Sequence, residues 1–221
     1  MNNKQTHIYF VPGLAADKEI FENISLPENL YTLHIISWLI PSKKETIAQY
    51  AKRMAGFVTE KNAVLVGVSF GGVVAQEMNS FLKLKKLIII SSIKTKHELP
   101  TKFKIAKNLR FYKLIPTRLF LTSKNYSRFA LGPISKKKFK LYQDYLHIRD
   151  KRYLDWAIKN MICWNQENPL PGVYHIHGDS DPVFPIKNID NAIKIAGGSH
   201  IMLLTKGPQV CREIVNIISH N

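Results

Sequence analysis

Ser69 stands in the pattern Gly67-Val68-Ser69-Phe70-Gly71, between an apolar run and a segment with helical spacing. A serine hydroxyl is a weak nucleophile, and a sharp strand-to-helix turn exposes it to a base. The two glycines remove side chains that would collide where the strand meets the helix. The Phe70 N–H, at the start of that helix, would then point at a developing oxyanion. The pattern predicts a nucleophilic Ser69; the alternative is a glycine-rich turn that contains an incidental serine.

A serine nucleophile needs a histidine base and an acid that orients the histidine, and on such a turn they follow in the order serine, acid, histidine. His200 follows Gly197-Gly198-Ser199, directly after an expected strand, and is the predicted base. Asp179 and Asp181 follow the strand expected before it. Asp181 lies further into the loop and is the predicted acid, whereas Asp179 is expected to organise the turn through backbone N–H groups.

The loop after the first expected strand, Val11-Pro12-Gly13-Leu14-Ala15, suits a second oxyanion donor. We predict that the Leu14 N–H is this donor and that Gly13 lets the backbone approach the substrate. Other large apolar residues near the loops at the same edge are predicted to line an acyl pocket, or else to be ordinary core residues: Trp38, Trp164, Met202, Phe21 and Phe184.

Alternating strands and helices must position these groups. Apolar or β-branched runs predict six strands, at residues 7–11, 31–38, 63–68, 87–90, 173–176 and 192–196. Helical spacing predicts helices at residues 45–59, 70–81 and 210–218. Strands that alternate with helices favour an α/β fold with a doubly wound, mostly parallel six-stranded sheet.

The net charge of +16 is concentrated in one segment. Residues 94–159 hold 18 Lys and Arg against four Asp and Glu, an excess of +14. Helical spacing recurs here at 103–113, 139–146 and 150–161, with no strand of comparable quality. We therefore expect residues 94–164 to form a basic helical insertion between two strands, and residues 1–93 and 165–221 to form the core.

With these motifs in order, the chain resembles the α/β-hydrolase fold family of serine hydrolases. The resemblance places the family's nucleophile at Ser69, its acid at Asp181 within His177-Gly178-x-x-Asp181-x-x-x-Pro185, and its base at His200 within Gly198-Ser199-His200. It also implies that the insertion is a helical cap. The family's sheet normally has two further strands at its start, and its oxyanion loop often begins His-Gly where this chain has Pro12-Gly13. A serine at the turn disfavours the family's dehalogenases and epoxide hydrolases, which use aspartate there.

These features predict a serine hydrolase that cleaves a carboxylic ester or related acyl bond without a metal or organic cofactor. One alternative is a metal hydrolase built on His175, His177 and Asp179, whose residue types are metal ligands. Another is a non-catalytic or nucleic-acid-binding module that uses the basic insertion and its aromatic residues. The excess charge favours anionic acyl substrates or an anionic membrane surface, or else merely solvates the cap helices.

The cysteine content and the first residues of the sequence predict the cellular compartment of the protein. Two cysteines, Cys163 and Cys211, cannot form a disulfide framework, which favours a reducing compartment. A signal peptide would need a longer apolar region near the start, and the apolar stretch there breaks at Pro12-Gly13. We therefore expect a cytoplasmic protein.

Overall fold

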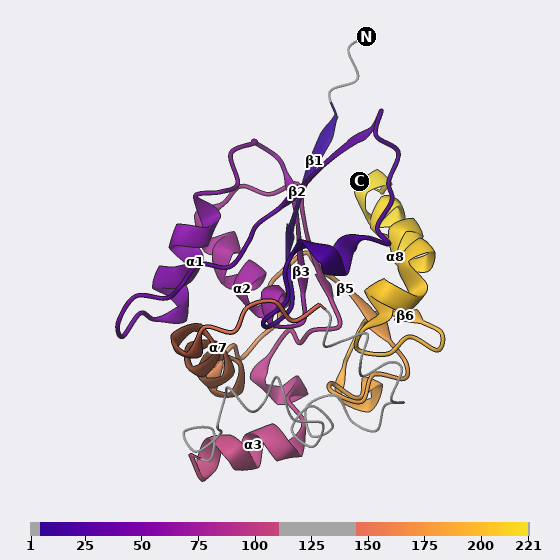
Figure 1. The fold of residues 1–221 in the computed structure, drawn as a ribbon. Helices are drawn as coiled ribbons and strands as arrows, with labels where there is room; N and C mark the ends of the chain where they lie inside the picture. The colour runs from indigo at the N-terminus through magenta and orange to yellow at the C-terminus, as the bar shows by residue number, and fades with distance from the viewer. Residues whose placement is uncertain (1–4, 111–144, 221) are drawn as a thin grey trace.

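A parallel β-sheet forms the centre of the protein (Figure 1). The computed structural model describes residues 5–110 and 145–220, and the description below is confined to them. Six strands lie in the order β2-β1-β3-β4-β5-β6, and each neighbouring pair is parallel. The strands are β1 (Thr6–Val11), β2 (Tyr31–Ile35), β3 (Val64–Val68), β4 (Lys86–Ile90), β5 (Val173–Gly178) and β6 (Ile193–Ile195).

Helices cover both faces of this sheet, which confirms the doubly wound α/β prediction (Figure 1). One face packs against α1 (Ile47–Ala55), α2 (Phe70–Met78) and α7 (Lys151–Cys163). The opposite face packs against α8 (Met202–Ser219) and the short 3₁₀ helix η1 (Lys18–Phe21). Helix α3 (Thr101–Asn108) lies beyond the ends of the strands. Further 3₁₀ turns are η2 (Asn79–Phe81), η3 (Lys96–Glu98) and η5 (Ile186–Asn188).

Several element boundaries differ from the sequence prediction, and for two of them the physical reason is clear. Strand β2 ends at Ile35 rather than Trp38, because the chain there leaves the sheet and turns the Trp38 side chain into the core. The last helix begins at Met202 rather than residue 210. It contains Pro208 and is kinked at Lys206, whose φ of −135° is not helical. Proline interrupts helical hydrogen bonding, so the apolar pattern before it gave no helix signal.

The order of the strands determines where a site can form. The chain passes from β1 to the edge strand β2, returns to β3 on the other side of β1, and then continues outward to β6. Helices on opposite faces therefore diverge between β1 and β3. Parallel α/β sheets bind ligands beyond the carboxyl ends of the strands at such a reversal. The loops that follow β1 and β3 carry Gly13-Leu14 and Ser69.

The predicted insertion lies between β4 and β5, two neighbouring strands. Its described part contains α3 and α7, where helical spacing was expected, whereas residues 111–144 lie outside the described residues. Helix α7 packs on the core: Tyr153, Leu154 and Trp156 are buried in the same cluster as the apolar faces of α1 and α2. The proposed division into a core and a 94–164 cap stays a prediction.

Within the described ranges, no helix has both the length and the apolar character needed to cross a membrane.

The approach of α2 to β1 yields a stability prediction. A Cβ on Gly71 would lie 2.2 Å from the Pro12 carbonyl oxygen and 2.4 Å from that of Val11. Backbone atoms cannot rotate away, so Gly71→Ala should lower the free energy of unfolding by at least about 2 kcal/mol. Urea unfolding measures this loss. Gly13→Ala is the control, because its Cβ would make ordinary contacts at 3.7 Å; an equal loss in both variants would contradict the explanation.

Candidate active site

Ser69 occupies the sharp turn between β3 and α2. Its backbone has φ 52° and ψ −119°, a positive-φ conformation that is unfavourable for a residue with a side chain. Three hydrogen bonds hold it there: the Ser69 N–H donates to the Ile90 carbonyl (2.9 Å), and the Ser69 carbonyl accepts from Ser92 Oγ (2.7 Å) and the Gly72 N–H (2.9 Å). The turn therefore directs the Ser69 side chain away from the sheet.

Glycines make this turn sterically feasible, as the sequence predicted for Gly67 and Gly71. A Cβ on Gly67 would lie 2.4 Å from the Gly71 carbonyl oxygen, where β3 and α2 meet. Gly72, which the sequence pattern did not single out, has the same requirement, because its Cβ would lie 2.4 Å from Ser92 Oγ. Ser92 thus both bonds to the turn and fills the space beside it.

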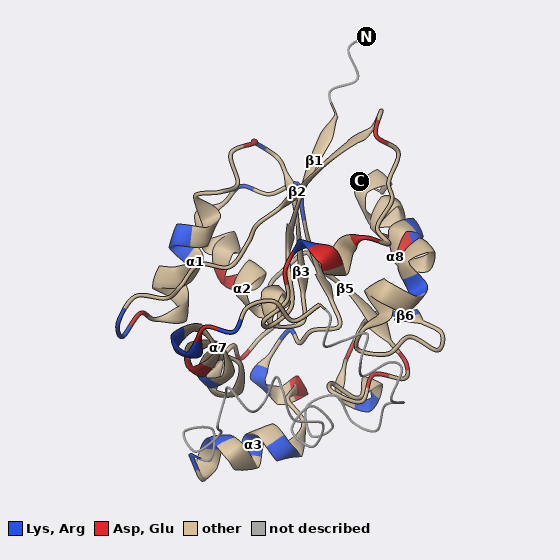
Figure 2. Cartoon of the chain, in the orientation of Figure 1, with Lys and Arg blue, Asp and Glu red and all other residues tan. Residues whose placement is uncertain are grey.

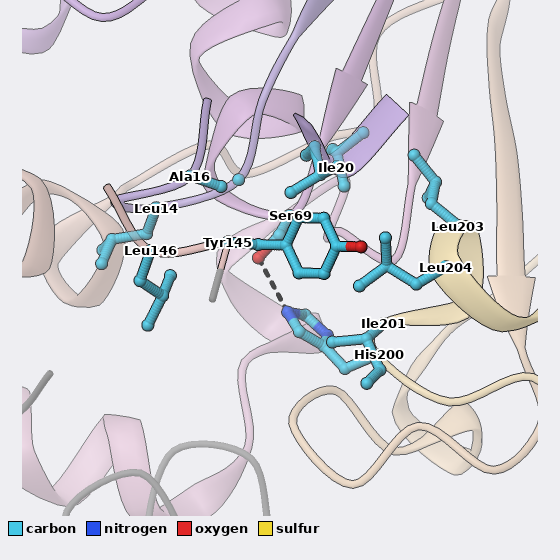
Figure 3. Close-up of a pocket in the computed structure, with 12 residues that line it drawn as sticks. Leu14, Ala16, Ile20, Ser69, Tyr145, Leu146, His200, Ile201, Leu203 and Leu204 are labelled. Atoms are coloured by element: carbon cyan, nitrogen blue, oxygen red, sulfur yellow. Dashed lines mark hydrogen bonds between the residues drawn. The ribbon is translucent and has the colours of Figure 1, made fainter. Parts of the chain in front are cut away.

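The three predicted catalytic side chains lie in one hydrogen-bonded chain. Ser69 Oγ is 2.9 Å from His200 Nε2, and His200 Nδ1 is 2.9 Å from Asp181 Oδ2 (Figure 3 shows the first contact). With the Nδ1 proton donated to Asp181, His200 Nε2 is free to accept the Ser69 hydroxyl proton. Residues 131 positions apart are brought together because β3 and the loop after β6 end at the same edge of the sheet.

Asp181 is buried, and its carboxylate is fully hydrogen-bonded. Oδ1 accepts from the Val183 N–H (2.7 Å) and the Phe184 N–H (3.0 Å), while Oδ2 faces His200. Burial on its own would raise the pKa of Asp181. The charge of His200 and the hydrogen bonds from His200 and Phe184 outweigh burial, and the pKa of Asp181 is lower than usual. The acid is therefore held ionised beside the imidazole.

Asp179 has the separate role that the sequence suggested. Its Oδ1 accepts from the Gly197 N–H (2.9 Å) and from Ser180 Oγ (2.9 Å). These bonds join the loop after β5 to the loop that carries His200. Asp181, and not Asp179, contacts His200.

His177 lies behind Asp181 and is completely buried. Its Nε2–H donates to the Phe184 carbonyl (2.8 Å), and its Nδ1 is 3.1 Å from His175 Nε2. Burial lowers the pKa of His177, although the charge of Asp181 opposes this shift. A neutral His177 therefore holds the backbone of Phe184 in place. The Phe184 N–H in turn donates to Asp181, and the Phe184 ring packs against the His200 ring at 5.4 Å between centroids.

The metal-site alternative lacks a converging set of ligands. His175 and His177 contact each other, whereas Asp179 faces the Gly197 N–H and Ser180. Among the described residues, no group of three or more His, Cys, Asp or Glu side chains is arranged to hold a metal ion.

The loop after β1 lies beside Ser69 and is held by aromatic side chains. Trp38 Nε1–H donates to the Gly13 carbonyl (3.0 Å), and the Ala15 N–H donates to Tyr153 Oη of α7 (3.4 Å). Within the described part of the chain, the N–H groups of Leu14 and Phe70 donate to no other group. This leaves both predicted oxyanion donors available, while their role stays a prediction.

A cavity of about 60 Å³ opens beside Ser69 and His200 (Figure 3). Gly13 lines it, as predicted, together with Leu14 from the same loop. Its other walls come from η1 and the turn before it, the end of β3, the start of α8, and residues 145–146. The cavity therefore lies on the α8 side of the sheet.

Three of the residues predicted either to line an acyl pocket or to belong to the core are not among those that line this cavity, and all three are buried in the core. Trp38 and Trp164 are buried on the opposite face, where Trp38 stacks on Phe70 at 5.6 Å between ring centroids and Trp164 Nε1–H donates to Glu77 Oε1 (2.8 Å). Met202 is fully buried in the core under α8. Large apolar residues near the loops were expected at the pocket, but their size suits them to fill the core between sheet and helices.

The two remaining aromatic residues also have packing roles. Phe21 packs against Phe10 at 4.9 Å between ring centroids, and Phe184 packs between Phe103 and His200. Neither is among the residues that line the cavity.

Several solved structures superpose on nearly the whole of this chain. A bromoperoxidase from Bacillus anthracis superposes with a TM-score of 0.70 at 14% sequence identity, covering 99% of this chain and 94% of that one. An enol-lactonase from Burkholderia xenovorans gives 0.69 at 12% identity, covering 98% and 92%, and an esterase from Exiguobacterium antarcticum gives 0.68 at 15%, covering 100% and 94%. The chain has the α/β-hydrolase fold. No protein-family model and no curated protein matches the sequence.

Several contacts of the site in this α/β-hydrolase fold were not predicted from the sequence. The Val183 and Phe184 N–H groups hold Asp181, and a signal existed for them, since an aspartate followed by proline commonly bonds backbone N–H groups two and three residues on. Ser92, Tyr145 and Leu204 carried no such signal, because their roles arise from distant elements that fold together.

Asp181 gives the fold a defined dependence on pH. The pKa of Asp181 is lower in the folded protein than in the unfolded chain, where it is about 3.9. Ionised Asp181 therefore stabilises the fold above about pH 3.9, and this stabilisation is lost as the pH falls through the pKa of the folded state. We expect the free energy of unfolding to drop between about pH 5 and pH 2, and to drop less steeply in Asp181→Asn, which does not titrate. Urea unfolding at stepped pH tests this. Equal acid slopes in both proteins would mean that other carboxyl groups cause the loss.

Proposed function

We propose that the protein is a serine hydrolase that cleaves carboxylic esters or closely related acyl bonds. The observation that carries the proposal is the hydrogen-bonded chain Ser69–His200–Asp181 at the carboxyl edge of the sheet, with 2.9 Å at both contacts. The named neighbours of the same fold include an esterase and an enol-lactonase, which supports acyl chemistry. Cleavage of a lactone, thioester or amide would use the same groups.

In the proposed reaction, Ser69 Oγ attacks the carbonyl carbon while its proton passes to His200 Nε2. The oxyanion formed accepts hydrogen bonds from the Leu14 and Phe70 N–H groups. When the tetrahedral intermediate collapses, the bond to the alcohol breaks and His200 gives the proton to the departing oxygen. Water then attacks the acyl-enzyme, its proton goes to His200 and on to Ser69 Oγ, and the carboxylic acid leaves.

Asp181 supports both halves of this cycle. Its ionised carboxylate keeps the His200 proton on Nδ1 and stabilises the imidazolium that forms at each transfer. Burial makes this interaction stronger than it would be in water. The mechanism uses no metal and no organic cofactor.

The first prediction concerns the nucleophile. Ser69→Ala removes one hydroxyl at a turn that backbone bonds hold, so it should keep the fold and lose at least about 10³-fold in kcat. Wild-type protein should react stoichiometrically with a fluorophosphonate probe, and the variant should not. Mass spectrometry of the labelled peptide measures this, and labelling of Ser69→Ala would disprove the assignment.

Asp181→Asn and Asp179→Asn form a matched pair that tests the acid in the same assay. Asp181→Asn should lose at least about 10³-fold in kcat, because the amide favours the wrong imidazole tautomer. Asp179 touches only the turn, so its variant should lose stability while retaining most of the turnover. Reversed results would move the acid to Asp179.

We further propose that the basic insertion favours substrates with an anionic group. Helix α3 carries Lys102, Lys104 and Lys107 and no acidic residue (Figure 2). Burial lowers the pKa of Lys102, and the charge of Asp181 opposes that shift, so the charge of Lys102 interacts with Asp181. A positive field at a site raises the encounter rate with anionic ligands. The substrate is therefore proposed to be a small acyl compound with a carboxylate or phosphate, free or at an anionic lipid surface.

Salt dependence tests this preference. The screening length falls from about 10 Å at 0.1 M to about 3 Å at 1 M. The ratio of kcat/KM for an anionic ester to that for a matched neutral ester should exceed one at low salt and fall several-fold across this range. A flat ratio would mean that the lysines only solvate the insertion. Salt-sensitive binding of nucleic acid that persists in Ser69→Ala would favour the binding-module alternative.

A cytoplasmic location stays a prediction. It agrees with Cys163 and Cys211 being free thiols in the structure.

A further inference from the structure

We propose that the cavity beside Ser69 binds the acyl group of the substrate and admits only short aliphatic chains, of about two to four carbons. The proposal rests on the serine hydrolase function above and names its substrate class. Three features of the cavity carry it: its position relative to Ser69, the chemistry of its walls and its volume.

The cavity begins at the reacting atoms. Ser69 and His200 line it (Figure 3), as do Gly13 and Leu14 of the predicted oxyanion loop. A carbonyl carbon bonded to Ser69 Oγ, with its oxygen near the Leu14 N–H, would therefore direct one substituent into this space.

The walls are hydrocarbon. Ala16 and Ile20 come from the segment after β1, Val68 from the end of β3, and Leu203 and Leu204 from the first turn of α8. The Tyr145 ring lies across the cavity beside Ser69 (Figure 3), and its hydroxyl bonds to Glu22. Among the described residues that line the cavity, none is a lysine, arginine, aspartate or glutamate. A charged group there would lose its hydration without gaining a partner, so an uncharged aliphatic chain is the matching ligand.

The volume limits the length of that chain. The cavity holds about 60 Å³, whereas an apolar cavity of about 150 Å³ binds benzene and one water molecule takes about 30 Å³ of liquid. About two methylene-sized groups therefore fit beyond the carbonyl, which centres the two-to-four-carbon range on an acyl chain of about three carbons. Ala16, Ile20, Val68 and Leu203 belong to the core under α8 and are at most 9% exposed, so close packing opposes any widening of the cavity.

The acyl group suits this cavity better than the alcohol does. The alcohol must leave before water attacks, and it therefore needs a route to solvent. The inner wall of the cavity is instead formed by the buried side chains of Val68 and Leu203. The acyl group stays bonded to Ser69 through both steps and can remain against this wall. An anionic group on the substrate would then belong to the alcohol part, on the side of the basic insertion.

The test is a series of aryl esters with one leaving group and straight acyl chains from acetate to octanoate. A buried methylene contributes about a fourfold gain, so kcat/KM should rise from acetate towards butyrate and then fall at least about tenfold by octanoate. A second series with the acyl group fixed as acetyl and the alcohol lengthened should show no such fall. A fall in the alcohol series alone would overturn the proposal, because the cavity would then hold the leaving group.

Leu204→Ala should move the limit to longer chains, raising the hexanoate-to-acetate ratio of kcat/KM at least about fivefold. Leu204 is half-buried, so its truncation widens the cavity without removing a core side chain. Leu26→Ala is the control: Leu26 is buried in the core cluster that contains the cavity walls Ala16, Ile20, Val68 and Leu203, but it does not itself line the cavity. It should leave the ratio unchanged, and thermal unfolding confirms that both variants fold.

The outcomes separate this proposal from the function on which it rests. If octanoate is cleaved as well as butyrate, or both variants shift the ratio equally, the short-acyl assignment is wrong and the hydrolase stands. If none of the esters is cleaved and a fluorophosphonate does not label Ser69, the hydrolase function itself fails.

Discussion

The strained backbone at Ser69 is the constraint on which the rest of the site depends. A non-glycine residue at φ 52° costs about 1–3 kcal/mol, so its surroundings must hold it in place. Strand β4 does so through the Ile90 carbonyl and through Ser92, whose hydroxyl bonds to the Ser69 carbonyl and whose side chain fills the space beside Gly72. Strand β1 does so by packing its end against Gly71. Two strands and one helix are thus arranged around a single turn, and the serine hydroxyl faces outward as a result.

The acid side of the site is organised by backbone rather than by further charges. Asp181 accepts hydrogen bonds from two backbone N–H groups of the residues that follow it. His177, which is neutral, holds that segment in place by donating a hydrogen bond to the Phe184 carbonyl. This arrangement stabilises a buried carboxylate without a permanent counter-ion beside it. It lets the charge of Asp181 act on His200, where a positive charge would develop at each proton transfer of the proposed mechanism. A lysine or arginine in the same place would neutralise that effect.

The two faces of the sheet have different tasks. On the α1–α2–α7 face, an aromatic cluster containing Trp38, Tyr50, Tyr153 and Trp156 fills the space up to the loop after β1 and hydrogen-bonds to its backbone. On the α8 face, aliphatic side chains leave a small cavity beside Ser69. The insertion contributes to both, because α7 joins the aromatic cluster and Tyr145 crosses the cavity. Not all lysines of the predicted insertion are exposed to solvent. Lys94, at the start of the insertion, is buried, and its Nζ lies 3.4 Å from Glu98 Oε1.

The fold class, the six strands and the order of the predicted catalytic residues could all be predicted from the sequence alone. Those features are local: an apolar run, a glycine on either side of a serine, and a loop that follows a strand each leave a signal within a few residues. The tertiary structure decided the walls of the cavity, the role of Ser92 and the true places of Trp38, Trp164 and Met202. Such features depend on which side chains from distant segments meet, and apolar residues carry the same pattern whether they fill a core or line a pocket. The beginning of α8 was also decided by packing, since Gly207 and Pro208 argue locally against a helix while the apolar side chains around them are buried against the sheet.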